Sequence, residues 1–172
     1  YAPRIEFSYL LDTSDNVIIS TACLWGILNR ASENIQKKFL DFIIKNKNRC
    51  FLEVQHHNVP DQKAYNQKLY NLSKTYGLQL VACTDTHSLN DEHAEGRKIL
   101  QLSKNIRFDD EEGWDLTFKS YDELCEAYKK QDSLPKEVYL EAIENTNKIA
   151  DMVETFEVDR KTKYPHIYDD LD

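Results

Sequence analysis

A carboxylate and an imidazole stand two residues apart in the stretch Thr84-Asp85-Thr86-His87, directly after the apolar run LQLVAC at 78–83. In a loop, residues at i and i+2 can both turn toward one ion, one through an oxygen and the other through a ring nitrogen. Such donors suit zinc and related transition metals. The pair alone is a weak signal, because an aspartate in a loop also commonly forms an Asx turn.

Two other apolar runs also end in residues that can do chemistry. STACLWG follows the run VIIS and contains Cys23, while LEVQHHNVP contains Glu53, Gln55, His56 and His57. Each has an ordinary structural alternative: a cysteine after a strand is more often a small buried residue, and a loop histidine more often caps a helix or binds a backbone carbonyl. The other residues of these types are expected to be structural, with Cys50 and Cys83 in the core, His93 on a helix surface and His166 in the tail.

Hydrophobic periodicity predicts the elements that position these residues. Apolar and β-branched runs predict strands at 17–21, 50–55 and 78–83. Helical spacing predicts helices at 3–12, 31–48, 59–77, 91–104 and 135–153. Pro60 and Gly77 suit the start and end of the third of these helices, and Ser120-x-x-Glu123 opens a further short helix as a capping box.

Strands that alternate with helices predict an α/β fold with a parallel sheet. The carboxyl ends of parallel strands meet at one edge, where such folds carry their functional loops. We therefore expect Cys23, His57 and Asp85 to lie in neighbouring loops. Periodicity does not decide between a barrel and an open sheet.

The composition is that of one globular domain. The chain has 172 residues, of which 41% are hydrophobic and 30% charged, with a net charge of −8. It contains neither a secretory signal nor an apolar run of the roughly 18 residues a membrane helix needs. Four scattered cysteines favour reduced thiols and a cytoplasmic location. The acidic balance argues against strong nonspecific DNA binding by this chain alone. Because it starts at Tyr1 rather than Met, we expect a piece of a longer protein.

The segment FLEVQHHNVPDQKAYNQKLYNLSKTYGLQLVACTDTHSLNDEHAEGRKIL at 51–100 resembles the polymerase-and-histidinol-phosphatase (PHP) domain of bacterial DNA polymerase III alpha subunits. That family shows Y-[IL]-E-[IL]-Q-x-H-G, then V-A-T-N-D-x-H-Y. Upstream, NVIISTACLWGIL is similar to the family's S-G-C-L-x-G loop. Downstream, RFDDEEGWDLTFKSYDELCEAY is similar to its F-Y-L-K-S-x-E-E-M segment, and EAIENTNKIADMVE to its E-A-x-x-N-T-x-x-I-A helix. The departures are Asn58 for Gly, Thr84 for Asn and Ser88 for Tyr.

The resemblance implies a fold and a metal site. The fold is part of a distorted (β/α)7 barrel with parallel strands and flanking helices. Residues 1–155 correspond to the C-terminal half of the domain and 156–172 to a tail or linker. Complete domains bind divalent ions, Zn, Mn or Mg, and by resemblance Cys23, Asp85 and His87 are metal ligands, with Glu53 and His57 nearby. The family's H-x-H motif and its other ligands lie upstream of the matched segments, and no catalytic residue is assigned.

The function implied is that of the family's full-length protein, a DNA-directed DNA polymerase and nucleotidyltransferase in DNA replication. Its partners are DNA and other replisome subunits. Metal-assisted phosphoester hydrolysis in the PHP domain would give a 3′–5′ exonuclease or proofreading-related role, or the domain would be structural. The alternatives are a stand-alone histidinol-phosphatase-like phosphoesterase and a non-catalytic scaffold. This chain alone lacks the polymerase palm, so we expect it to be catalytically silent, to bind metal weakly and to expose strand edges that favour association.

Overall fold

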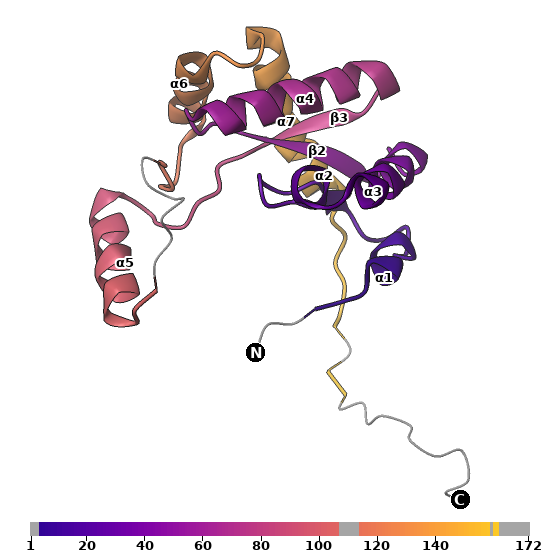
Figure 1. The fold of residues 1–172 in the computed structure, drawn as a ribbon, viewed down its shortest axis with the longest axis horizontal. Coiled ribbons are helices and arrows are strands. Elements are labelled where there is room, and N and C mark those ends of the chain that lie inside the picture. Colours follow the sequence, from indigo (N-terminus) through magenta and orange to yellow (C-terminus); the bar gives the residue numbers. More distant parts are fainter. Residues whose placement is uncertain (1–3, 107–113, 159, 162–172) are drawn as a thin grey trace, which may run out of the picture.

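The computed structural model describes residues 4–106, 114–158, 160 and 161. The expectations for Pro3 and His166, and for most of the tail, lie outside these residues. The elements in chain order are α1 (Phe7–Leu11), β1 (Ile19–Ser20), α2 (Ile27–Arg30), α3 (Glu33–Lys45), β2 (Cys50–Gln55), α4 (Pro60–Tyr76), β3 (Gln79–Cys83), α5 (Asp91–Ser103), α6 (Tyr121–Gln131) and α7 (Lys136–Met152) (Figure 1).

The three strands form one parallel sheet in the order β1-β2-β3. Ile19 pairs with Cys50, and Phe51 pairs with Gln79. The parallel α/β arrangement is confirmed, because each strand is followed by a helix before the next strand begins. The described residues form this sheet and not a closed barrel, so the barrel stays a prediction for a complete domain.

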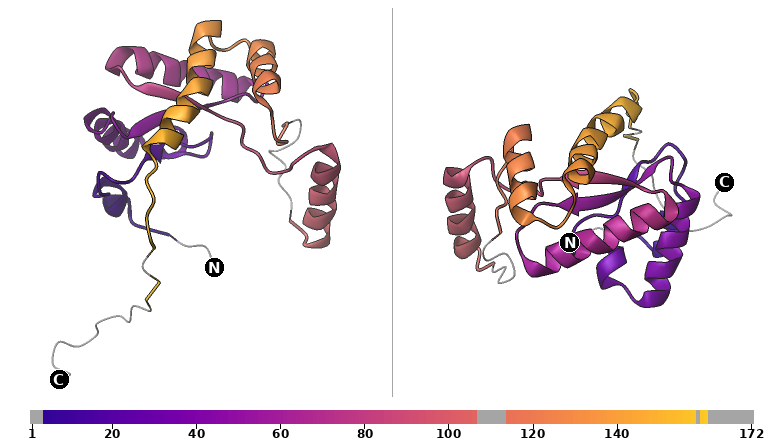
Figure 2. Two further views of the ribbon diagram at one scale, coloured as in Figure 1. Left: turned by 180° about the vertical axis from the view of Figure 1, so that it is seen from behind. Right: turned by 90° about the horizontal axis from the view of Figure 1, so that it is seen from above.

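The core lies where alternate strand residues meet the helices. Leu52, Val54, Leu80 and Ala82 belong to one buried cluster, into which α3, α4, α6 and α7 also send apolar side chains. Helix α4 packs on β2 and α7 packs on β3, and the strands run between these two helices (Figure 2). This packing fixes the sheet and therefore the origin of each loop at its carboxyl edge.

Several predicted boundaries are confirmed. Pro60 begins α4, and Gly77 ends it in the left-handed conformation at φ 65°, which costs a residue without a side chain little. The capping box at the start of α6 forms as predicted, because the Ser120 amide donates to the Glu123 carboxylate at 2.8 Å and the Glu123 amide to the Ser120 hydroxyl at 3.5 Å.

All four cysteines lie in the described part and are free thiols. His93 is exposed, and no described helix is long and apolar enough to cross a membrane.

The first strand and first helix are shorter than predicted. Strand β1 covers two residues in place of 17–21, because the Val17 amide is turned toward Ser14 and its carbonyl accepts from Arg49 at 2.9 Å. Helix α1 covers 7–11 in place of 3–12 and buries none of its residues. The single turn α2 was not predicted. Gly26 makes it possible, since a Cβ there would collide with the Thr21 carbonyl oxygen.

Helix α5 matches its predicted range within one residue but not its expected packing. None of its residues is buried, and Ile99, Leu100 and Leu102 are 62%, 53% and 70% exposed. In both figures it stands beside the layer of strands and helices rather than on it (Figures 1 and 2). The apolar residues that suggested an amphipathic helix therefore find no partner among the described residues.

Candidate functional site

The site lies at the carboxyl edge of the sheet, where the loops after the three strands begin. The loop after β1 carries Ala22 at φ 58°, and the loop after β3 carries Asp85 at φ 50°. Positive φ is uncommon for residues with a side chain, and Asp tolerates it better than most. Such conformations cluster at functional sites, where surrounding contacts hold them.

The loops after β2 and β3 meet through His57 and Asp85. The ring Nε2 of His57 lies 3.2 Å from Oδ2 of Asp85, and the histidine is only 2% exposed. A neutral imidazole with its proton on Nε2 donates in this geometry. The hydrogen bond from His57 lowers the pKa of Asp85, against the effect of burial, which raises it. The observed partner of His57 is thus a carboxylate, not the helix end or backbone carbonyl of the ordinary alternative.

His87 turns back onto the same aspartate. Its Nδ1 lies 2.7 Å from the backbone oxygen of Asp85 and 3.7 Å from the carboxylate Oδ1. Its side chain is 42% exposed, so one face of the ring reaches solvent. Asp85 and His87 therefore contact each other within one loop, and their turning toward one ion stays a prediction.

A segment far along the chain completes this region. The amide of His87 donates to the carbonyl of Leu116 at 2.8 Å, and Phe118 donates to Ser88 at 2.9 Å. The ring of Trp114 packs against His57 with centroids 4.5 Å apart. The return of residues 114–118 to the D-x-H loop was not predicted, since no periodicity marks this segment.

Buried His56 and partly buried Lys119 are two further polar groups near this loop. Burial, then the neighbouring His57 and Lys119, lower the pKa of His56 to about 4, so its ring is neutral near pH 7. Lys119 lies 2.8 Å from the carboxylate of Asp115. Burial alone would raise the pKa of Asp115, but hydrogen bonds from Lys119 and Thr117 outweigh it and lower that pKa to about 2. Lys119 lies in the segment that resembles the family's L-K-S stretch, which is the signal that would have found it.

Glu53 forms a second polar centre on β2. Its carboxylate accepts from the Ser20 hydroxyl at 2.7 Å and from the Gln55 amide at 3.0 Å. Burial first, with Glu53 and Asp85 nearby, raises the pKa of Cys83 to about 11. Cys83 is therefore a protonated thiol. It is half-buried, whereas Cys50 is fully buried in the core.

The predicted ligands are only partly brought together. Asp85 and His87 share one loop, with His57 bound to Asp85, whereas half-buried Cys23 lies in the loop after β1. Among the described residues, no three Cys, His, Asp or Glu side chains are grouped closely enough to hold a metal ion. A metal at the D-x-H loop would therefore need further donors.

Comparisons with known proteins find similarity to DNA polymerase III subunits. No protein-family model matches it. The DNA polymerase III subunit alpha of Borreliella burgdorferi is 30% identical over 169 residues, covering 92% of this chain and 14% of the relative. That of Aquifex aeolicus is 34% identical over 114 residues, covering 62% and 10%. The PolC-type DNA polymerase III of Thermotoga maritima is 28% identical over 185 residues, covering 99% and 13%.

The chain is therefore related to DNA polymerase III alpha and PolC-type polymerases along most of its length. It spans only 10% to 14% of the length of these curated relatives.

Proposed function

We propose that this chain is a segment of the alpha subunit of a bacterial replicative DNA polymerase III and belongs to its PHP-type domain. The observation that carries the proposal is the similarity to the Borreliella burgdorferi alpha subunit over 92% of the chain. The parallel strand order and the D-x-H loop at the carboxyl edge support the domain type. DNA and other replisome subunits are the partners that follow, through the full-length protein.

Within that domain, Cys23, Asp85 and His87 are proposed to contribute to a divalent-metal site, for Zn, Mn or Mg. Glu53 and His57 lie beside it, and the remaining ligands come from other parts of the full-length protein. The convergence of Asp85 and His87 in one loop supports this assignment. The His57 contact at 3.2 Å would orient the carboxylate, as residues behind metal ligands commonly do.

A structural role is the second candidate. The specific observation in its favour is that protein groups already hold the D-x-H loop, with His57 on the Asp85 carboxylate and the Asp85 carbonyl on His87. A domain of this kind would brace the polymerase or contact a proofreading partner without hydrolysing anything. A stand-alone phosphoesterase has less support, because the relatives described above are polymerases.

The test uses the full-length gene product that contains this chain. It is assayed for primer extension and for 3′–5′ hydrolysis of single-stranded DNA, together with Asp85→Asn and the matched surface control Asp91→Asn. We expect primer extension in all three proteins. If the PHP-type site is catalytic, Asp85→Asn lowers hydrolysis by at least about tenfold while Asp91→Asn does not. Equal hydrolysis in all three assigns the domain a structural role, and failure of the wild type to extend a primer contradicts the polymerase proposal.

A further inference from the structure

Helix α5 belongs to an excursion of the chain whose base is held at the D-x-H loop. At this base the amide of His87 donates to the Leu116 carbonyl at 2.8 Å, and the amide of Phe118 donates to the Ser88 carbonyl at 2.9 Å. Ser88 and Thr117 also pair as neighbouring parallel strands do. Since α5 lies between these residues in the sequence, whatever holds α5 also acts on the D-x-H loop.

Helix α5 has one apolar face and one polar face. At about 100° per residue, Ile99 lies at the centre of the apolar face, with Leu100 and Leu102 on its two sides. Arg97 and Gln101 lie on the opposite side of the helix. An apolar stripe of this kind ordinarily faces a protein core, and none of the described residues covers it here.

The contacts within α5 give it little support of its own. A helix of 13 residues is marginal in water without tertiary packing. The Asn90 side chain caps it by accepting from the His93 amide at 2.9 Å. The ion pair between Lys98 and Glu95, at 3.5 Å, is exposed and therefore contributes little. A partner packed on the apolar face would supply the missing stabilisation.

Gly96 lies on the same side of α5 as the apolar face, because it precedes Ile99 by three residues and Leu100 by four. A glycine inside a helix weakens that helix relative to other residues. A Cβ at this position would meet no atom within 4 Å, so none of the described residues requires a glycine here. A segment that approaches this face closely would require one.

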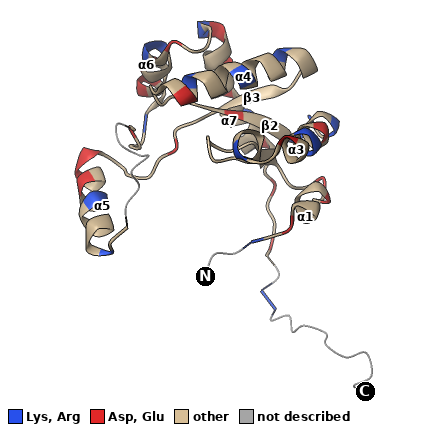
Figure 3. Cartoon of the chain, viewed as in Figure 1, with Lys and Arg blue, Asp and Glu red and all other residues tan. Residues whose placement is uncertain are grey.

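The charges of α5 favour a protein surface over nucleic acid as its partner. Acidic residues lie in its first turn and basic residues lie farther along (Figure 3). The helix has three acids, Asp91, Glu92 and Glu95, and two bases, Arg97 and Lys98. Nucleic acid is bound by surfaces with a clear excess of basic residues, which α5 lacks. Its apolar face therefore fits an apolar protein surface.

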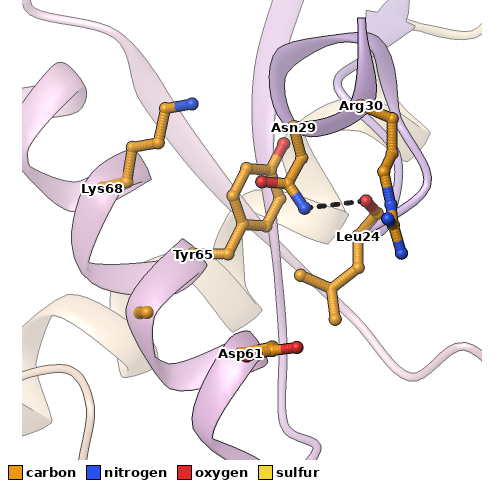
Figure 4. Close-up of a pocket in the computed structure, with 7 residues that line it drawn as sticks. Leu24, Asn29, Arg30, Asp61, Tyr65 and Lys68 are labelled. Atoms are coloured by element: carbon orange, nitrogen blue, oxygen red, sulfur yellow. Dashed lines mark hydrogen bonds between the residues drawn. The ribbon is translucent and has the colours of Figure 1, made fainter.

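The pocket between α2 and α4 differs from this face, because the chain itself bonds polar groups that line it. The Lys68 amine donates to the Leu28 carbonyl at 2.6 Å, and the Asn29 amide donates to the Leu24 carbonyl at 2.9 Å (Figure 4). The apolar face of α5 has no comparable contact among the described residues.

We propose that the apolar face of α5 docks on another part of the same polypeptide, outside residues 1–172. This inference rests on the proposed function, in which this chain spans 14% of a subunit such as its Borreliella burgdorferi relative. The remaining donors of the proposed metal site then come from elsewhere in that polypeptide and reach Asp85 and His87. A segment that reaches this loop passes beside the base of α5, so one docked segment holds both.

The first test is hydrogen exchange, followed by mass spectrometry, of the full-length gene product and of the dilute 172-residue chain. We expect the amides of 91–103 to exchange at least about tenfold more slowly in the full-length protein, because docking suppresses local opening. Ile99→Glu in the full-length protein should remove this protection and also speed exchange at 84–90. Gln101→Glu, which adds the same charge on the opposite side of α5, is the matched control and should keep both.

A photo-crosslinker then locates the partner without a change at the centre of the face. In the full-length protein, p-benzoylphenylalanine replaces Leu102, whose side chain is 70% exposed at the side of the face. We expect crosslinks within one polypeptide to residues outside 1–172. Crosslinks only between two copies, only to another protein, only to DNA or only within 1–172 would each overturn the proposal. Equal exchange of α5 in the two proteins, or unchanged protection in Ile99→Glu, would overturn it too.

Primer extension by the same full-length preparation reports on the proposed function separately. A protein that extends primers while α5 exchanges as fast as in the isolated chain overturns the docking alone. A protein with protected α5 that fails to extend primers overturns the polymerase assignment and leaves the docking in place.

Discussion

At the residue scale, Arg49 holds the segment that precedes β1 in place. Its guanidinium is buried and donates to the carbonyls of Thr13 and Val17 at 3.0 and 2.9 Å, and to the Asn46 side chain at 3.2 Å. The residue is 3% exposed, so water cannot replace these donors. The side chain therefore ties the segment before β1 to the turn that precedes β2.

We expect Arg49→Ala to lower the free energy of unfolding by about 2–4 kcal/mol, because a buried side chain is removed and several partly buried acceptors lose their donor together. Urea unfolding followed by circular dichroism measures the change. Lys47→Ala, an exposed change two residues away, is the matched control and should alter stability by less than about 0.5 kcal/mol. Equal effects of the two changes on the free energy of unfolding would show that the Arg49 hydrogen bonds do not stabilise the fold.

Asp115 gives the chain a defined acid sensitivity. Its pKa is lowered to about 2 in the folded protein, below the value of about 3.9 of an unfolded chain. A carboxylate with a depressed pKa stabilises the fold above its unfolded pKa, and this contribution is lost as the pH falls through the folded pKa. We expect the stability difference between wild type and Asp115→Asn to be constant above about pH 5 and to fall progressively between about pH 5 and pH 1, measured as midpoints of thermal unfolding. A difference that grows on acidification would contradict this pKa.

At the scale of elements, the junction of α6 and α7 holds the loop after β2. Buried Gln131 donates from Nε2 to the carbonyl of His57 at 2.7 Å and to that of Gln55 at 2.9 Å. Its Oε1 accepts from Asn66 at 2.9 Å and from Ser133 at 2.6 Å. One side chain thus fixes the backbone of His57, and with it the contact of His57 with Asp85.

We expect Gln131→Glu to release His57, because a carboxylate keeps the acceptor and loses the donor. The readout is the Nε2–H proton resonance of His57 and its protection from exchange. Ser133→Ala is the matched control, since it weakens the same network without touching the His57 carbonyl, and it should keep the resonance. A folded Gln131→Glu protein with an unchanged His57 resonance would show that Gln131 does not position this loop.

The sequence predicted the elements whose signals are local. The bounds of α4 follow from Pro60 and Gly77, and the start of α6 follows from Ser120 and Glu123. What it could not predict depends on distant contacts. His57 and Asp85 are 28 residues apart, and Gln131 and His57 are 74 apart, so no periodic pattern records either pair. The unpredicted turn α2 has only four residues, too few to show a period.

The D-x-H loop also has features that the sequence predicted and features that depend on distant contacts. Its two residues follow a strand and contact each other, but that they turn toward one ion stays a prediction. The role of Cys23 as a ligand stays a prediction, because it came from resemblance and no group of three donors forms among the described residues. Trp114 and Lys119 lie near this loop because the segment that follows α5 runs back to it. Hydrophobic periodicity does not reveal such a return.

At the scale of the whole molecule, α5 has an apolar face that none of the described residues covers. Ile99 and Leu102 are more than half exposed, and apolar faces of this kind favour association. We expect the isolated chain to associate as its concentration rises, seen by size-exclusion chromatography with light scattering. Ile99→Glu with Leu102→Glu should reduce association, and Phe156→Glu, at an exposed apolar residue elsewhere, should not. A stable monomer at all concentrations would contradict the expectation.

We propose that this chain is one segment of a longer polymerase subunit and that it supplies only part of that subunit's metal site. It spans 14% of its Borreliella burgdorferi relative, and two of its proposed ligands share one loop. The direct measurement is the nucleotide sequence on both sides of the segment that encodes Tyr1–Asp172. We predict one continuous reading frame, with an H-x-H motif encoded upstream and a domain with clustered carboxylates encoded downstream. A reading frame that starts and stops close to these residues would contradict the account.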